Sequence, residues 1–358
     1  MSFLRMRESM LAFMDFRLRG NDGGFSDNLI PMKKTLEKVL GKVLVLGGSG
    51  FVGRHVCEKL TRQNIHVTVP TRRRSNAYSV QSLPMLDVLE VDIHDPAALA
   101  ALVAGHDAVV NLVAVLHGDE AAFERAHVEL PKKLAAACQQ AGVKRLVHVS
   151  ALGAAADGPS MYQRSKARGE TVLQAAGLDL TILRPSVIFG ADDKFLNLFA
   201  KLQKVFPVMP LAGAATKFQP VWVEDVAQAV VNSLTQQSAS ANPVIEACGP
   251  DVLTLKELVQ LSAIAAGINR GLGRPVLALP PFLGKLQAMA MRLLPGEPLI
   301  SQDNLDSMKV DNVGTGKLPN LQTLGITPSA LAAIVPTYLG NSSVLRQQLA
   351  FRKTAGRF

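Results

Sequence analysis

Short apolar runs alternate with amphipathic segments along the first two thirds of the chain. The apolar runs have the length of β-strands, and we expect strands at 42–47, 65–70, 87–91, 107–113, 144–150 and 179–184. The segments between them show helical spacing, and we expect helices near 51–63, 96–104, 119–141, 160–176 and 192–205. Such alternation predicts a parallel sheet with helices on both faces. The nearly continuous apolar run at 108–113 is what a sheet covered on both faces requires.

This alternation loosens in the later part of the chain, where proline and glycine become frequent. We therefore expect a sheet domain over 39–235 and a smaller, α-rich C-terminal lobe over 236–358 with returning strands and a basic tail. Residues 1–38 are typical of a disordered extension or of a mis-assigned start. An expected helix at 282–294 has one apolar face, which predicts packing on the lobe's own core or a surface contact with a membrane or partner.

The first expected strand ends in a glycine-rich turn, GGSGFVG at residues 47–53, and a helical pattern follows at once. Glycines 47, 50 and 53 leave room for a sharp turn, for a diphosphate against the backbone, and for the helix to pack on the strand. Bare N–H groups at a helix N-terminus bind an anion without any lysine or arginine. The strand before and the helix after the motif distinguish it from an ordinary tight turn. The sequence thus predicts an α/β fold with a doubly wound, parallel Rossmann sheet that binds a dinucleotide.

The bulk composition narrows the class of protein. The chain has 358 residues, 48% of them hydrophobic and 19% charged, so a sizeable core is available. No apolar run is long enough to span a membrane, and the isolated Cys57, Cys138 and Cys248 indicate free thiols in a reducing compartment. The histidines show no metal-binding spacing, so we assign no metal. The net charge of +9 favours anionic partners, but no nucleic-acid module accompanies it, and we exclude nucleic acid.

Tyr162 and Lys166 stand four residues apart at the start of the helix expected after the fifth strand. That spacing places both side chains on one helical face. A lysine ammonium near a phenol favours the phenolate, which a hydride-transfer enzyme needs from its acid–base group. The pair alone also fits a tyrosine that merely packs at a helix start, but its place in a dinucleotide fold favours the chemical interpretation.

These two motifs occur in order with three others, at residues 91–93 (VDI), 183–186 (LRPS) and 221–227 (VWVEDVA). The series resembles the extended and atypical short-chain dehydrogenase/reductases, relatives of the NAD-dependent epimerases and dehydratases. More narrowly, SALGA at 150–154 followed by YxRSKxxGE from Tyr162 is similar to the nucleotide-binding accessory subunits of respiratory complex I and their bacterial homologues.

This resemblance implies a role for each motif. The glycine turn would cradle the diphosphate, the 91–93 strand end would lie beside the adenine, and Tyr162 with Lys166 would hold the ribose and nicotinamide. The residues expected at the cofactor are Gly47, Gly48, Ser49, Gly50, Phe51, Val52, Gly53, Thr71, Arg72, Arg73, Asp92, Ile93, Leu112, Val113, Ala114, Ser150, Tyr162, Lys166, Pro185, Ser186 and Val187. The expected catalytic residues are Tyr162, Lys166 and Ser150.

The end of the second strand departs from the NAD-selective pattern. An NAD-selective protein needs a carboxylate there for the ribose 2′-hydroxyl, and here Thr71 is followed by Arg72 and Arg73. The planar guanidinium of arginine donates two hydrogen bonds at once to a phosphate. We therefore expect NADP(H) in preference to NAD(H), while a solvated basic turn is the alternative.

A second departure concerns the catalytic hydroxyl. Family members place a serine or threonine after the fifth strand where this chain has Ala151, and Ser150 stands one residue early. Neighbouring residues of an extended chain point in opposite directions. Loss of a second donor to the substrate carbonyl weakens transition-state stabilisation by a few kcal/mol. The sequence thus argues against a vigorous reductase or epimerase.

Three functions stay open at this point. The first is an NADP(H)-binding protein that holds its cofactor structurally or with weak redox activity, as a partner of a respiratory or quinone-linked membrane complex. The second is an active NAD(P)H-dependent oxidoreductase or epimerase that uses Tyr162 and Lys166 on a quinone-, sterol- or sugar-nucleotide-like substrate. The third is an NADP(H) redox sensor. We expect a cytoplasmic protein with peripheral contact to the inner face of the cytoplasmic membrane.

Overall fold

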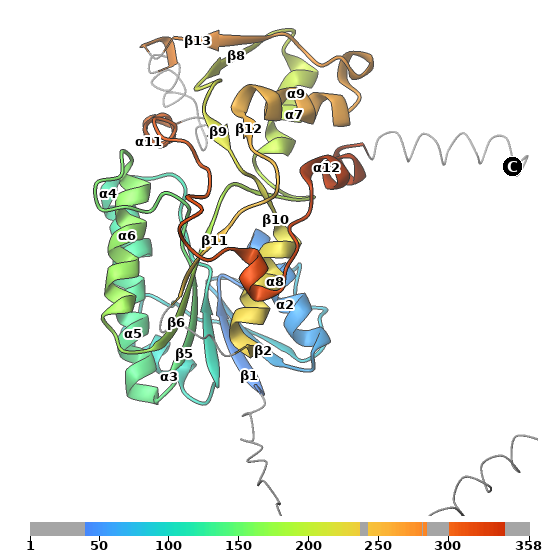
Figure 1. The fold of residues 1–358 in the computed structure, drawn as a ribbon. Coiled ribbons are helices and arrows are strands. Elements are labelled where there is room, and N and C mark those ends of the chain that lie inside the picture. Colours follow the sequence, from blue (N-terminus) through green and yellow to red (C-terminus); the bar gives the residue numbers. More distant parts are fainter. Residues whose placement is uncertain (1–39, 237–242, 281, 285–300, 341–358) are drawn as a thin grey trace, which may run out of the picture. The chain divides into compact units, whose positions relative to one another are not determined.

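The strands of the central sheet agree closely with those predicted from the sequence. A computed structural model describes residues 40–236, 243–280, 282–284 and 301–340, and within these ranges seven parallel strands form one sheet in the order β11-β6-β5-β4-β1-β2-β3 (Figure 1). Their bounds are β1 Lys42–Leu46, β2 His66–Thr71, β3 Leu86–Glu90, β4 Ala108–Asn111, β5 Arg145–Val149, β6 Asp179–Pro185 and β11 Val244–Ala247. The predicted fold class, an α/β doubly wound parallel sheet, is confirmed. β11 returns from the later part of the chain to pair with β6.

Helices cover both faces of the sheet (Figure 1). One face carries α2 (Phe51–Arg62) and α8 (Val223–Thr235), whose apolar residues share a core with β1 and β2. The other face carries α3 (Pro96–Val103), α5 (Leu130–Ala141) and α6 (Met161–Gln174), which share a second core with β4 and β6. Apolar residues of the strands contribute to both cores. This explains why the strands are nearly continuous apolar runs in the sequence.

The helix expected at 119–141 is interrupted. It consists of α4 (Glu120–Glu124), a π-helical turn η2 (Arg125–Glu129) and α5. Pro131 has no N–H and cannot donate to the carbonyl of His127 one turn earlier, which is a physical reason for the wider turn. α6 packs against that carbonyl, because a Cβ placed on Gly169 would overlap the oxygen of His127. The turn carries His127 toward α6.

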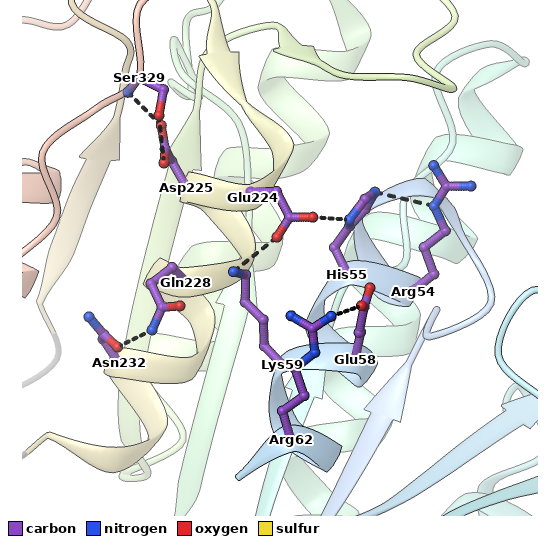
Figure 2. A network of polar contacts seen from close by, with 10 residues as sticks. All are labelled: Arg54, His55, Glu58, Lys59, Arg62, Glu224, Asp225, Gln228, Asn232 and Ser329. Carbon is purple, nitrogen blue, oxygen red and sulfur yellow. Dashed lines mark hydrogen bonds and ion pairs between the residues drawn. The ribbon is translucent and has the colours of Figure 1, made fainter. Parts of the chain in front are cut away.

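Polar contacts join α2 to α8 across the first face (Figure 2). Both carboxylate oxygens of Glu224 are used, one by His55 Nδ1 at 2.6 Å and one by Lys59 Nζ at 2.9 Å. Next along α8, Asp225 accepts the backbone N–H of Ser329 at 2.7 Å. Glu224 and Asp225, the acidic residues of the VWVEDVA motif, therefore hold α2, α8 and the chain near residue 329 together.

Beyond the sheet, a smaller group of elements packs around its own apolar core. This core is built from aromatic and aliphatic residues such as Phe189, Phe199 and Phe218. The elements are β7 Ile188–Phe189, α7 Leu196–Val205, β8 Met209–Ala212, β9 Lys217–Phe218, β10 Val221–Trp222, β12 Leu253–Thr254, α9 Leu255–Ala265, β13 Val276–Leu279, α11 Gln302–Ser307 and α12 Leu331–Leu339, with the short η1 Arg74–Ala77, η3 Ile268–Gly271 and η4 Leu321–Leu324 elsewhere in the chain. The helix expected at 192–205 begins at Leu196, since the Asp193 carboxylate binds the backbone N–H groups of Gly190 and Phe195 instead.

The N-terminal extension expected at 1–38 lies outside the described residues, as does most of the helix expected at 282–294. The boundary between a sheet domain and a lobe at residue 235 stays a prediction. In the described ranges, the structure has no helix that is both long and apolar enough to cross a lipid bilayer.

Candidate nucleotide site

The glycine turn between β1 and α2 is shaped for a group that lies directly on the backbone. Gly47 adopts a left-handed conformation with φ of +80°, and a Cβ on Gly53 would overlap the carbonyl oxygen of Gly47. A Cβ on Gly48 would lie 2.7 Å from Val69, so the turn is pressed against β2. Ser49 completes the turn, and Phe51 and Val52 begin α2.

The N-terminus of α2 has its N–H groups available to a ligand. Gly50 is the N-cap residue, no side chain caps the helix, and its first turn holds no acidic residue. The first N–H groups of an α-helix have no partner inside the helix, and the helix dipole adds positive potential there. This end of α2 therefore fits a diphosphate group in charge, in donors and in the space that the glycines leave.

The strand ends beside this turn form the corner expected for the adenosine. Thr71 ends β2, is buried, and donates its hydroxyl to the carbonyl of Arg73 at 3.0 Å. Arg72 and Arg73 are exposed. Asp92, also exposed, accepts the N–H of His94 at 2.9 Å and so shapes the loop after β3, with Ile93 half-buried inside it. Thr71 and this loop are joined directly by the bond from the Val91 N–H to the Thr71 carbonyl, at 3.0 Å.

Cations gather around His94 in this corner. Burial lowers the pKa of the His94 imidazole, and Lys133, Arg125 and Arg72 lower it further, while Asp92 opposes them. Lys133 also donates to the His94 carbonyl at 2.8 Å. The buried Nδ1 of His94 has no hydrogen-bond partner among the described residues. Sequence reasoning missed Arg125, Lys133 and His94, since η2 and α5 approach this corner only through packing.

The segment after β4 lies against the glycine turn. The Leu112 N–H donates to the Leu46 carbonyl at 2.9 Å, and a Cβ on Gly47 would lie 3.2 Å from the Leu112 carbonyl carbon. The side chain of Asn111 accepts the N–H of Val113 at 3.1 Å and holds this segment extended toward Ala114. The expected lining residues 112–114 are thus brought beside the predicted diphosphate site.

Lys166 is enclosed in the protein interior. It is 2% exposed, and its ammonium donates to the carbonyl of Val149 at 3.2 Å. Burial lowers its pKa from 10.5 to about 8, and Glu170 opposes that change. Tyr162, one helical turn earlier, is half-buried, and burial raises the pKa of its phenol to about 12. The expected electrostatic preference for the phenolate was therefore wrong for this arrangement, because burial of the hydroxyl outweighs any effect of the lysine.

The remaining predicted residues lie at or just after the ends of β5 and β6. Ser150 follows β5, is buried, and has a hydroxyl without a hydrogen-bond partner in the part of the chain that the structure describes. Pro185 at the end of β6 accepts the N–H of Leu152 at 2.9 Å, which joins the segments after the two strands. Ser186 donates to the side chain of Asn312 at 2.6 Å, and Val187 accepts the Val221 N–H at 3.0 Å. Ser186 and Val187 are thus held by the chain around 221 and 312.

A buried histidine, His127, organises this end of the site, and no local pattern in the sequence indicates it. His127 Nε2 accepts the backbone N–H of Val115 at 3.1 Å, so its hydrogen is on Nδ1 and is donated to Ser165 Oγ at 2.8 Å. Ser165 donates to the carbonyl of Tyr162 at 2.9 Å. Burial lowers the pKa of His127 to about 3, and Lys166 adds to that effect, so the ring is neutral. His127 also meets the Tyr162 ring edge to face.

The start of α6 is held by a carboxylate from far along the chain. Asp303 in α11 accepts the backbone N–H of Met161 at 2.6 Å and of Tyr162 at 3.2 Å. Ser160 and Gln163 form a capping box at the same end. A charged cap near a helix N-terminus is favoured by the helix dipole. Asp303 thus connects α11 to Tyr162, the residue expected to carry out the chemistry.

Among the described residues there is no cluster of histidine, cysteine, aspartate and glutamate side chains that could hold a metal ion. Cys57, Cys138 and Cys248 are free thiols, and burial raises the pKa of each to about 12.

The fold and this edge define a nicotinamide-nucleotide protein, and the chain belongs to the NAD(P)H-binding family, which matches it over residues 47–237. It is 32% identical over 317 residues to the mitochondrial NADH dehydrogenase (ubiquinone) 1 alpha subcomplex subunit 9 of Mus musculus, covering 86% of this chain and 80% of that protein. It is also 30% identical over 193 residues to the ceramide reductase of Caulobacter vibrioides, covering 53% of this chain and 60% of that protein.

A solved structure agrees with these relatives. A double mutant of DesIV, a dTDP-glucose 4,6-dehydratase from Streptomyces venezuelae solved with NAD bound, is 25% identical and superposes with a TM-score of 0.59 over 74% of this chain and 95% of its own. Both resemblances drawn from the sequence, to the epimerase/dehydratase relatives and to the complex I subunit, are confirmed.

Proposed function

We propose that this chain binds NADP(H) in preference to NAD(H), with the 2′-phosphate beside Arg72. The observation that carries the proposal is the corner at the end of β2. Thr71 occupies the position where an NAD-selective protein needs a carboxylate, and Arg72, Arg125 and Lys133 surround His94 there. A doubly charged phosphate gains from several nearby cations, whereas a ribose hydroxyl does not.

The proposed residue roles are those expected from the sequence. Gly47 to Gly53 hold the diphosphate, Asp92 and Ile93 lie beside the adenine, and Leu112 to Ala114 line the groove. Tyr162 and Lys166 hold the nicotinamide ribose, with residues 185–187 over the ring. Bound cofactor would supply a hydride at this end of the groove.

We infer further that the nucleotide is held structurally or with weak redox activity. Ala151 offers no hydroxyl, and the Ser150 hydroxyl is buried. Tyr162 is the remaining acid, and its raised pKa makes the phenol a weaker proton donor than an ordinary tyrosine. A single weak donor to a substrate carbonyl supports slow turnover at most. The similarity to a subunit of NADH dehydrogenase supports a role as a nucleotide-binding partner of a respiratory, quinone-linked membrane complex, with peripheral contact to the inner face of the cytoplasmic membrane.

The nucleotide preference is tested by calorimetry on the purified full chain. NADPH should bind more tightly than NADH, and Arg72→Ala should weaken NADPH binding about tenfold with little change for NADH, which corresponds to about 1.4 kcal/mol. Arg62→Ala is the matched control, because Arg62 lies at the other end of α2 and pairs with Glu58 on the surface. Equal affinities for the two nucleotides in the parent protein would contradict the preference.

A second candidate is an active reductase, which the ceramide reductase relative and the Tyr162–Lys166 pair favour. In that case Tyr162 donates its proton to the substrate oxygen, and Lys166 holds the ribose. Tyr162→Phe separates the two functions. If the nucleotide is structural, the variant keeps its bound NADPH through gel filtration and no turnover is lost; a quinone- or ketone-dependent oxidation of NADPH that disappears in the variant supports the enzyme instead.

A further inference from the structure

The chain between α7 and β8 exposes apolar side chains without interruption. Residues 205–208, Val-Phe-Pro-Val, are all exposed, and Val205 is 74% and Phe206 50% open to solvent. The helix ends there, since the Phe206 N–H makes the last helical bond, to Leu202 at 2.8 Å. A run of consecutive exposed apolar residues is unfavourable in water, and an exposed apolar patch is typical of a surface that contacts protein or membrane.

A second apolar segment lies beside the first. Leu272 is 81% exposed, Leu277 59% and Phe282 68%. The two segments are joined by the parallel pairing of β8 with β13, which sets Leu277 opposite Pro210, and by the Met209 N–H, which donates to the Pro275 carbonyl at 2.9 Å. We call Val205, Phe206, Val208, Leu272, Leu277 and Phe282 the apolar edge. Figure 1 shows β8 and β13 beyond α7 and α9, away from the seven-stranded sheet.

Only cations accompany the apolar edge along these two segments. Residues 196–210 and 268–284 contain Lys201, Lys204, Arg270 and Arg274 and no aspartate or glutamate. Arg274 is fixed there, because its Nε donates to the carbonyl of Gln203 at 3.3 Å. Lys201, Lys204 and Arg270 are exposed. Apolar side chains among basic ones and without acidic ones match the interface of a bilayer that contains anionic lipid.

We propose that the apolar edge inserts into the surface of an anionic phospholipid bilayer, with the four cations against the lipid phosphates. This proposal rests on the peripheral membrane association proposed above and names its surface. A second copy of this chain is a poorer occupant, since a symmetric contact would bring the same cations together and expose them to mutual repulsion. The nucleotide turn, on the sheet, is not part of this surface, so lipid binding and NADP(H) binding are separable.

The test is flotation of the purified full chain with phosphatidylcholine vesicles, with and without phosphatidylglycerol. The protein should float only with phosphatidylglycerol, and rising salt should release it. Val208→Glu should weaken the association about tenfold or more, while Val252→Glu should not, because the two valines are 43% and 47% exposed and only Val208 belongs to the apolar edge. Lys204→Gln should weaken it about fivefold, against no loss for the exposed Lys217→Gln.

Each other outcome overturns the proposal. Absence of flotation, or equal effects of Val208→Glu and Val252→Glu, excludes the apolar edge as the lipid contact. A concentration-dependent dimer that Val208→Glu dissociates would assign the edge to a subunit interface. NADPH affinity, measured without vesicles, is expected to be unchanged in all four variants. A failure of lipid binding with NADPH binding intact therefore leaves the proposed nucleotide preference standing.

Discussion

The two helical layers on the sheet differ in how deeply their polar contacts are buried. Between α2 and α8 the contacts are ionic and reach the surface: Glu224 bridges His55 and Lys59 with about a quarter of its side chain exposed, at 27% (Figure 2). Around α6 the contacts that face the sheet are buried, and they include the ion pair of Glu170 with Arg184. There, the neutral His127 bonds Ser165, and the enclosed Lys166 bonds a carbonyl.

We interpret the α2–α8 layer as one that stabilises the fold and the α6 layer as one that holds the proposed ligand. Ion pairs at the α2–α8 contact lower the pKa of Glu224 to about 2, chiefly through the His55 hydrogen bond, so its charge stabilises the fold. Burial at α6 instead disfavours the charge on Lys166. Because the surroundings of Lys166 disfavour its charge, this layer must be held together by packing. A ligand that binds the lysine would stabilise it further. Three substitutions test this contrast.

The largest effect is expected from Gly169→Ala in the buried layer. The added Cβ would overlap the carbonyl oxygen of His127, and neither backbone can move without displacing the π-helical turn. Overpacking against backbone should lower the free energy of unfolding by about 3 kcal/mol or more. Gly177→Ala is the control: nothing lies within 4 Å of its Cβ, and only its left-handed φ of +66° opposes the change, at about 1 kcal/mol.

Urea unfolding monitored by circular dichroism measures both changes. If the two variants lose equal stability, α6 does not depend on its close approach to η2. In that case the buried layer would be as tolerant as the α2–α8 layer, and the contrast between them would fail.

The parts of these layers that the sequence predicts are those that depend on neighbouring residues. The glycine turn, the six strands and the position of Tyr162 were predictable, because strand length, helix periodicity and motif spacing are properties of neighbouring residues. The π-helical turn was not, because Pro131 and the residues before it keep a helical apolar pattern while the backbone widens. Before Pro131, therefore, the apolar pattern of the sequence does not indicate the geometry of the backbone.

Contacts between distant residues were also beyond the sequence. Asp303 caps α6 across 142 positions, and the cations near His94 come from the turn after β2, from η2 and from α5. The region after residue 205 is composed of short strands such as β8 and β13, too brief for periodicity to mark them. The sequence therefore predicts residues for a nucleotide site, but it does not predict the contacts that support them.

The second prediction concerns the pH dependence of stability in the buried layer. The pKa of Lys166 is about 8 in the folded protein against 10.5, so between these values the unfolded chain holds a proton that the folded protein has lost. Stability conferred by the wild-type lysine should therefore rise with pH across that window. Relative to Lys166→Met, the free energy of unfolding should increase by about 2 to 3 kcal/mol from pH 7 to pH 10.5.

Denaturant titrations of both proteins at each pH give this difference directly, since titrations of groups that do not interact with Lys166 cancel. Below pH 7 the difference should be flat, which serves as the internal control. A difference that does not change between pH 7 and pH 10.5 would mean that the lysine keeps its ordinary pKa, and the proposed strain in this layer would be absent.

The smallest effect is expected from Glu224→Gln in the exposed layer. Its pKa is lowered from 4.5 to about 2, so the stabilisation is complete above pH 4.5 and is lost as the pH falls through about 2. Solvent screens a side chain that is partly open, and we expect a loss of about 2 kcal/mol at pH 7, reduced at high salt. Glu58→Gln, which breaks only the surface pair with Arg62, should cost about 0.5 kcal/mol or less.

Salt should leave the cost of Gly169→Ala unchanged, because that cost is steric. Equal salt dependence of Gly169→Ala and Glu224→Gln would show that the layers do not differ in the way proposed.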